Sequence, residues 1–183
     1  YVIVAAGLET HRYCGGLTQA GTTYLLATEP VEEFAGWRGT CLIHREGDAR
    51  QYVTVTPDQR ILIGGLDSSV LDEKGRVARL INLQNLAEKR HHALAYTLRD
   101  MFPAIRNITA EYVWAAKDGR TSDGLPVIGR LPANSHVAYA MCCGDNGILY
   151  AEAAGRLLLV QYQGVDNQQL GLFSPHREWR IKR

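Results

Sequence analysis

The segment best suited to binding chemistry lies between an expected strand and an expected helix. It reads Cys142-Cys143-Gly144-Asp145-Asn146-Gly147, and the mostly apolar stretch 148–162 follows it. Backbone N–H groups in the first turn of a helix have no partner within that helix and carry partial positive charge. Glycines leave such a backbone open to close approach. The segment therefore favours an anionic or electron-rich ligand, although a tight turn without a ligand explains the same residues equally well.

Other candidate residues lie at turns and on polar strand faces. Tyr52 is on the polar face of an alternating strand, where it could line a pocket, and Lys117 and Arg120 lie in a charged segment that could equally be a solvated loop. His44 is expected to be structural. His91 and His92 are adjacent on an expected helix, so their side chains point about 100° apart. Both are interpreted as part of a solvated helix face, and no metal site is predicted.

Buried strands and one long amphipathic region would position these residues. Residues 1–6 are apolar without alternation, which is typical of a strand covered on both faces. The period-two pattern of 51–56 and the turn at 57–59 predict an antiparallel hairpin with 60–65. Further strands are expected at 23–28, 40–44 and 108–116, with 8–22 as a connection. Helices are expected over 77–102, in two pieces, and over 146–162, and 172–177 is expected to pack as an extension.

Composition narrows the class of protein. The net charge of +1 over 183 residues gives no electrostatic basis for binding nucleic acid. No apolar run approaches the roughly 20 residues that cross a bilayer. The four cysteines match neither paired zinc knuckles nor a disulfide framework, so reduced thiols and a cytoplasmic location are expected. The chain opens directly on an apolar strand, which suggests that it is a fragment that begins inside a domain.

A set of short motifs in a fixed order resembles the C-terminal half of the FAD-dependent D-amino acid oxidase (DAO) family, including its glycine oxidase and gamma-glutamylputrescine oxidase-like members. The motifs are Ala5-Ala6-Gly7, Tyr24 to Pro30, Asp58 to Gly65, Trp114, Asp123 to Gly129 and Gly144 to Ile148. They span nearly the whole chain. Each motif is weak alone, and their order and spacing carry the resemblance.

The resemblance implies an α/β plus α+β fold. Residues 1–23 and 121–183 would be the C-terminal part of an incomplete Rossmann-type FAD-binding domain. Residues 24–120 would be an inserted substrate-binding domain with a mainly antiparallel sheet. The flavin ring would lie near Gly7, Asp123, Gly124, Pro126, Gly144, Asp145, Asn146, Gly147 and Ile148. Tyr52, Lys117 and Arg120 would face a small-molecule amine or amino acid, whose C–N bond is oxidised to an imine by hydride transfer to FAD.

Several departures from the family pattern qualify this expectation. The Gly-x-Gly-x-x-Gly motif that holds the FAD pyrophosphate is absent from the 183 residues, so this chain alone is expected to be inactive without a missing N-terminal segment. Trp114-Ala115-Ala116 replaces a flavin-linking cysteine, which favours non-covalent FAD. Asp118 and Asp145 align with arginines of glycine oxidase-like members. These acidic residues would suit an amine-bearing substrate, and a surface turn explains them equally well.

Two other classes of function remain open from the sequence. The chain could be a non-catalytic α/β binding scaffold that has lost its flavin, or an α/β protein whose glycine loop binds another anionic ligand. The residues assign no catalytic base, and hydride removal from a neutral amine does not strictly need one. A homo-oligomer is possible. The electron acceptor is left open between dioxygen and another oxidant.

Overall fold

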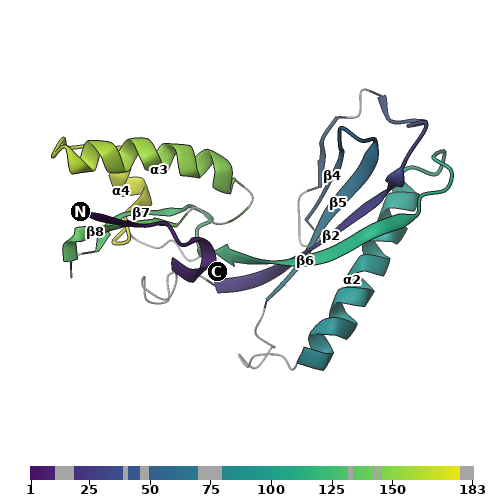
Figure 1. The fold of residues 1–183 in the computed structure, drawn as a ribbon, viewed down its shortest axis with the longest axis horizontal. Helices are drawn as coiled ribbons and strands as arrows, with labels where there is room; N and C mark the ends of the chain where they lie inside the picture. Colours follow the sequence, from purple (N-terminus) through teal and green to yellow (C-terminus); the bar gives the residue numbers. More distant parts are fainter. Residues whose placement is uncertain are drawn as a thin grey trace. The chain divides into compact units, whose positions relative to one another are not determined.

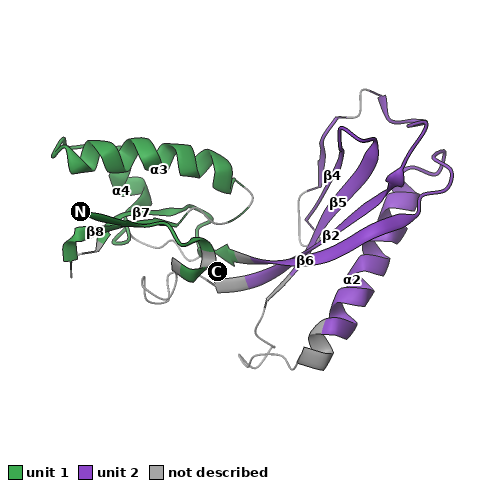
Figure 2. Ribbon diagram, viewed as in Figure 1, with its two compact units in different colours: residues 1–20, 118–183 green, residues 21–117 purple. Residues whose placement is uncertain are grey.

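The computed structural model of the protein describes residues 1–10, 19–38, 41–45, 50–69, 80–131, 134–141, 144 and 146–177. The chain forms two compact units (Figure 2): residues 1–20 with 118–183, here unit 1, and residues 21–117, here unit 2. Each unit has its own sheet and its own apolar core. The assignment of FAD-binding and substrate-binding domains, with boundaries after residues 23 and 120, stays a prediction.

A five-stranded sheet in the order β3-β4-β5-β2-β6 forms the centre of unit 2 (Figure 1). Its pairs β3–β4, β4–β5 and β2–β5 are antiparallel. The helix α2 (Leu80–Met101) packs against this sheet. The strands are β2 (Gln19–Pro30), β3 (Ile43–Arg45), β4 (Gln51–Val55), β5 (Arg60–Ser69) and β6 (Ala110–Arg120). The expected hairpin of β4 and β5 is confirmed.

The alternation along β4 decides which face of the sheet is buried. Val53 is 1% exposed and belongs to the same apolar cluster as Leu94 and Leu98 of α2. Gln51 points the same way, because its side-chain nitrogen lies 3.4 Å from the hydroxyl of Thr97 on α2. Tyr52 therefore lies on the opposite face, as the period-two pattern predicts.

A buried hydroxyl helps to join β2 to β5. The Thr28 side chain is fully buried, and its Oγ1 accepts a hydrogen bond of 3.0 Å from the backbone N–H of Ile61. The same hydroxyl donates to the carbonyl of Glu29 at 2.7 Å. Arg60 donates to the carbonyl of Thr28 at 2.9 Å and forms ion pairs with Asp58 and Glu111. These contacts satisfy polar groups where the strands meet at the edge of the core.

A smaller mixed sheet forms unit 1, in the order β1-β8-β7. β1 runs parallel to β8, and β7 runs antiparallel to β8. Residues of β7 and β8 pack with Ala154, Leu157 and Leu158 of α3. The elements are β1 (Val2–Val4), the 3-10 turn η1 (Gly7–Thr10), β7 (Val127–Leu131), β8 (Asn134–Met141), α3 (Gly147–Tyr162) and α4 (Gln169–Phe173).

Three expectations about the elements are wrong. β1 is an edge strand whose Val2 and Ile3 are 56% and 50% exposed, so within the described residues neither face is buried as expected. The helical region 80–101 is one continuous helix, whereas residues 77–79 lie outside the described part. The segment before α3 contains two strands, β7 and β8, although one was expected. Gly129 interrupts the apolar run of β7, so the sequence pattern did not predict this strand.

The lengths of two strands also differ from the sequence expectation. β6 continues to Arg120, so Lys117 and Arg120 lie in a strand, and the solvated loop that the sequence left open as an alternative is not formed there. β2 already begins at Gln19, inside the expected connection 8–22, and η1 occupies Gly7–Thr10. In both places, pairing with a neighbouring strand outweighs the weak strand propensity of polar residues and glycine.

Replacing the buried hydroxyl of Thr28 tests its role. Thr28→Val keeps the shape of the side chain but leaves the N–H of Ile61 without its acceptor. We expect the free energy of unfolding to fall by about 1–3 kcal/mol, measured by urea denaturation. Thr54→Val makes the same change at a half-buried position of β4 and is expected to change it by less than about 0.5 kcal/mol. Equal effects of the two variants would contradict this role for Thr28.

Candidate functional site

Three segments of unit 1 meet at one edge of its sheet. Because β1 and β8 are parallel, with Val4 paired to Tyr139, both strands end at the same edge. β7 starts at that edge, since Val127 pairs with Met141 at the end of β8. The described residues expected near the flavin belong to these segments: Gly7 after β1, Asp123, Gly124 and Pro126 before β7, and Gly144, Asn146, Gly147 and Ile148 after β8. Asp145 lies outside the described residues.

The backbone of the loop before α3 is open to a ligand. Gly144 has a φ of +87°, in the left-handed region, and its carbonyl accepts a 3.1 Å hydrogen bond from the N–H of Gly147. A Cβ atom added at Gly144 would meet no other atom within 4 Å. Asn146 precedes the first helical residue without a side-chain capping hydrogen bond, and Ile148 is 89% exposed. The first turn of α3 therefore presents its polar backbone beside open space.

Asp123 has a structural partner, Arg177, that the sequence analysis did not identify. Their ion pair measures 2.6 Å between Nε and Oδ2, and a second bond joins Nη2 to Oδ1 at 2.9 Å. Only 7% of the Arg177 side chain and 13% of the Asp123 side chain are exposed. The bonds to Arg177 are the main reason that the pKa of Asp123 lies below its ordinary value of 3.8. The carboxylate is therefore held in a two-point pair with a buried guanidinium.

The same guanidinium binds backbone carbonyls on both sides of the pair. Arg177 donates to the carbonyls of Leu125 at 3.0 Å and Pro126 at 2.9 Å, which belong to the turn before β7. It also donates to the carbonyls of Phe173 at 3.0 Å and Ser174 at 3.3 Å, after α4. Arg177 thus fixes the turn containing Asp123 to the C-terminal extension, whose predicted packing is confirmed. A basic residue in that tail was the available signal, but nothing in the sequence paired it with Asp123.

The turn itself has a defined geometry. The Asp123 carboxylate accepts a 3.1 Å bond from the N–H of Leu125, and the Thr121 hydroxyl donates to the Leu125 carbonyl at 2.7 Å. Gly124 has a φ of +75°, and a Cβ atom there would meet no other atom within 4 Å. Asp123 consequently shapes the turn, while Gly124 leaves its backbone open. Pro126 is buried at the start of the sheet.

The residues expected on the substrate side are not gathered within one unit. Tyr52 is half-buried on β4 and Lys117 is exposed on β6, both in unit 2, whereas the partly buried Arg120 belongs to unit 1. The pKa of the Tyr52 phenol is raised, mainly by burial and also by the negative charge of Asp67. The phenol is therefore harder to ionise than that of an ordinary tyrosine. The roles of all three residues toward a substrate stay predictions.

Two cavities lie away from the expected ligand residues. In unit 1, a cavity of about 570 Å³ near the C-terminal end of α3 is lined by residues such as Arg130, Gln161 and Asn167. In unit 2, a cavity of about 560 Å³ is lined by Glu29, Arg106 and their neighbours. None of the expected ligand residues lines either cavity. The candidate site is thus defined by the strand register and by accessible backbone.

The two adjacent histidines of α2 differ in environment. The Nε2 atom of His91 lies 3.1 Å from the carbonyl oxygen of Trp114, and its ring meets Tyr24 edge-on with centroids 5.9 Å apart. His92 is exposed. The interpretation of both as a solvated helix face is therefore wrong for His91, which links α2 to β6. In the part of the chain that the structure describes, no three His, Cys, Asp or Glu residues form a possible metal-binding group.

The described helices include none long and apolar enough to span a membrane. Cys41 is an exposed free thiol. The other three cysteines, including the adjacent pair before Gly144, lie outside the described residues.

Comparison with known proteins gives one family and a consistent fold. The family model described as FAD dependent oxidoreductase (DAO) matches residues 1–159. A glycine oxidase of Bacillus subtilis (strain 168) is 37% identical over 86 residues, which are 46% of this chain and 23% of that protein. A glycine oxidase of Bacillus licheniformis is 31% identical over 87 residues, covering 46% of this chain and 24% of that protein.

Solved structures extend the likeness over nearly the whole chain. Glycine oxidase from Geobacillus kaustophilus matches with a TM-score of 0.71 at 17% identity, covering 97% of this chain and 45% of that protein. The fructosamine oxidase Amadoriase II of Aspergillus fumigatus matches with a TM-score of 0.67 at 15% identity, covering 97% and 46%. The TM-scores show a shared fold, and at these low identities the likeness shows the fold alone. The chain spans less than half of the length of each of these proteins.

Removing the guanidinium of Arg177 is expected to unfold or loosen unit 1. Arg177→Gln leaves the buried Asp123 carboxylate without its cation, and breaking such a pair typically costs about 3–5 kcal/mol of unfolding free energy. Urea denaturation measures this loss. Arg156→Gln, which breaks an exposed pair with Glu152 on α3, is the matched control and should have a much smaller effect. Similar losses in both variants would refute a special role for Arg177.

The pH dependence of stability gives a second test of the pair. Because folding lowers the pKa of Asp123, its contribution is fully present above pH about 4 and is lost as the pH falls through the lower folded pKa. Asp123→Asn should therefore be less stable than the wild type at pH about 6, and the difference should shrink toward pH about 3. A difference that stayed constant over this range would contradict the ionised pair.

Proposed function

This chain belongs to the DAO family of FAD-dependent oxidoreductases, and from that premise we propose that it supplies the flavin-ring side of an FAD site together with a substrate-binding sheet. The observation that carries this proposal is the meeting of Gly7, the turn at 123–126 and the start of α3 at one edge of the unit 1 sheet. Ligands of α/β folds bind at the carboxyl ends of their strands. The expected cofactor residues that the structure describes lie there.

The described residues fit a flavin in two respects. Added Cβ atoms at Gly7, Gly124 and Gly144 would meet nothing within 4 Å, so three stretches of backbone are open to a planar ligand. Asn146 forms no side-chain cap. The N–H of Gly147 donates to the Gly144 carbonyl, and the N–H groups that follow it in the first turn of α3 can bind an electron-rich ring edge. These groups, with the neighbouring turn, would hold non-covalent FAD on its ring side.

The proposed reaction is oxidation of the C–N bond of an amine or amino acid to an imine. When bound, FAD supplies the acceptor for a hydride from the carbon next to the nitrogen. The positive start of α3 stabilises negative charge that develops beside it, in a preorganised electrostatic effect. Tyr52 contributes a protonated phenol that can orient a polar substrate group. No residue of the chain is assigned as a general base.

Exposed apolar surface on unit 1 supports a role for a dinucleotide-binding segment as partner. Val2 and Ile3 of β1 and Ile148, Leu159 and Tyr162 of α3 are each at least 50% exposed. Large exposed apolar side chains on neighbouring elements are typical of surfaces that another part of a protein covers. A segment with the Gly-x-Gly-x-x-Gly motif would cover them and bind the FAD pyrophosphate. The same surface would be compatible with a homo-oligomer.

The colour of the purified protein tests this function. We expect the natural polypeptide that carries these 183 residues to show the absorbance bands of oxidised flavin. Those bands should bleach with a D-amino acid, an N-methyl amino acid or a diamine. Release of hydrogen peroxide or reduction of a dye identifies the acceptor. A colourless protein that cannot be reconstituted with FAD would contradict an oxidoreductase and favour a binding scaffold.

A charge at the start of α3 tests the position of the cofactor. Asn146→Asp adds a carboxylate that suits the helix terminus but repels an electron-rich ligand. We expect FAD affinity to fall about tenfold, or about 1.4 kcal/mol, without loss of stability. Asn167→Asp, which places the same charge before α4, is the control. Equal FAD affinities in both variants would show that the cofactor does not lie at α3.

A further inference from the structure

The face of the unit 2 sheet opposite α2 carries a row of paired residues centred on Tyr52. Tyr52 pairs with His44 on β3 and with Gly64 on β5, and Gly64 pairs with Leu25 on β2. Paired residues of neighbouring strands point to the same face. The adjacent row contains Val53 and packs toward α2, so the Tyr52 row lies on the other face. We call this surface the open face.

The position of the Tyr52 ring is fixed by a glycine. A Cβ atom added at Gly64 would overlap the outer carbons and the hydroxyl of the Tyr52 ring. The ring therefore lies flat across the strand where a side chain would otherwise stand, which is a known way of stabilising a glycine in a sheet. Tyr52 is half-buried as a result. Its phenol oxygen lies over Gly64 on the open face.

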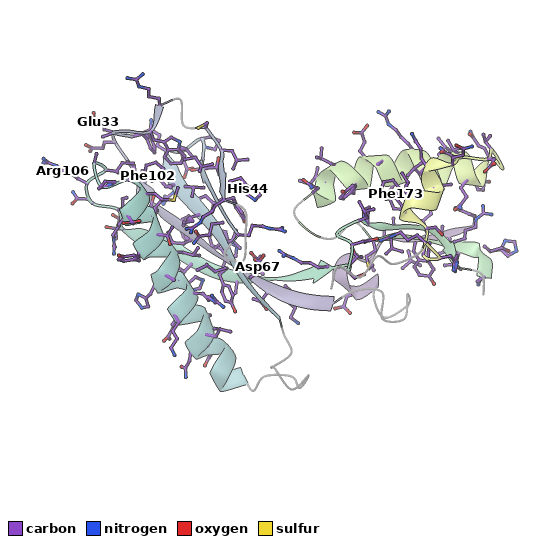
Figure 3. All side chains as sticks on the ribbon, turned by 180° about the vertical axis from the view of Figure 1, so that it is seen from behind. Glu33, His44, Asp67, Phe102, Arg106 and Phe173 are labelled. Atoms are coloured by element: carbon purple, nitrogen blue, oxygen red, sulfur yellow. The ribbon has the colours of Figure 1, made fainter. Side chains whose placement is uncertain are left out.

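An irregularity in β5 brings a carboxylate to the same face. Gly65 and Leu66 have φ values of +127° and +54°, and the N–H of Leu66 donates to the carbonyl of Arg50 at 3.1 Å. Leu66 packs against the core, so the next residue, Asp67, points to the open side. Figure 3 shows His44 and Asp67 on the side of the sheet away from α2. The charge of Asp67 also acts on the Tyr52 phenol, whose pKa it helps to raise.

We propose that the Tyr52 hydroxyl and the Asp67 carboxylate form an ammonium-binding subsite, so that the substrate is an amine carrying a second cationic group. An ammonium has three N–H donors, and a carboxylate and a phenol oxygen can accept two of them while Asp67 keeps its other contacts. Partial burial strengthens the attraction of Asp67 for a cation relative to an exposed pair. A substrate carboxylate would be repelled at the same place.

This inference rests on the proposed function only for the amine that is oxidised, because the subsite itself needs no flavin. Its chemistry differs from that of a site for simple amino acids, in which a basic residue would bind the substrate carboxylate. Arg50 lies two residues before Tyr52 in the sequence and is a basic residue that could bind such a carboxylate. Changing Asp67 and Arg50 in separate variants therefore shows whether the subsite binds an ammonium or a carboxylate.

Calorimetric titration with diaminobutane, aminobutane and butanoate tests the subsite in the natural polypeptide, with or without FAD. We expect diaminobutane to bind best and Asp67→Asn to weaken it about tenfold, or about 1.4 kcal/mol. Asp100→Asn removes the same charge from an exposed position of α2 and should leave binding unchanged. Tyr52→Phe keeps the ring over Gly64 and should weaken binding by a smaller factor. Thermal melting checks that each variant is folded.

Two results would overturn the subsite. One is equal binding of diaminobutane by the Asp67→Asn and Asp100→Asn variants. The other is tighter binding of butanoate than of either amine, with that binding lost in Arg50→Gln and retained in Asp67→Asn. If the protein contains flavin but Asp67→Asn does not weaken diaminobutane binding, the subsite is refuted and the oxidoreductase function is not. If the protein is colourless but its diaminobutane binding depends on Asp67, the oxidoreductase function is refuted and the subsite is not.

Discussion

The ion pair between Asp123 and Arg177 is the contact on which the candidate site depends. It joins the turn before β7 to the segment after α4, and the same guanidinium binds four backbone carbonyls. Because both charges are largely buried, each needs the other to offset the loss of water. The pair holds the turn rigid while Gly124 and Gly144 leave nearby backbone uncovered.

The two units use their sheets differently. The sheet of unit 1 brings strand ends to one edge, where polar backbone is exposed at the start of α3. The sheet of unit 2 is covered by α2 on one face and presents side chains such as Tyr52 on the other. Backbone groups suit a cofactor shared by a whole family, since they do not change with sequence. Side chains on an open face suit a substrate that differs between relatives.

Local pattern predicted most of the architecture. The alternation of 51–56 gave the faces of β4, and the apolar run after Asn146 gave α3 from Gly147 to Tyr162. The paired strands β7 and β8 were harder to predict because Gly129 interrupts an apolar run. The role of Arg177 depends on a partner 54 residues away. Periodicity within a segment carries no information about such long-range pairs. It also does not predict where a strand ends when that end is stabilised by pairing with another strand.

Because Tyr52 and Gly64 are in contact across two strands, substitutions at these two positions should depend on each other. A side chain at position 64 would occupy the space of the aromatic ring, so a larger residue there can be accepted only after residue 52 has become smaller. The converse order, loss of the ring first, would leave a bare glycine that weakens the sheet. Homologous sequences should therefore change at both positions together.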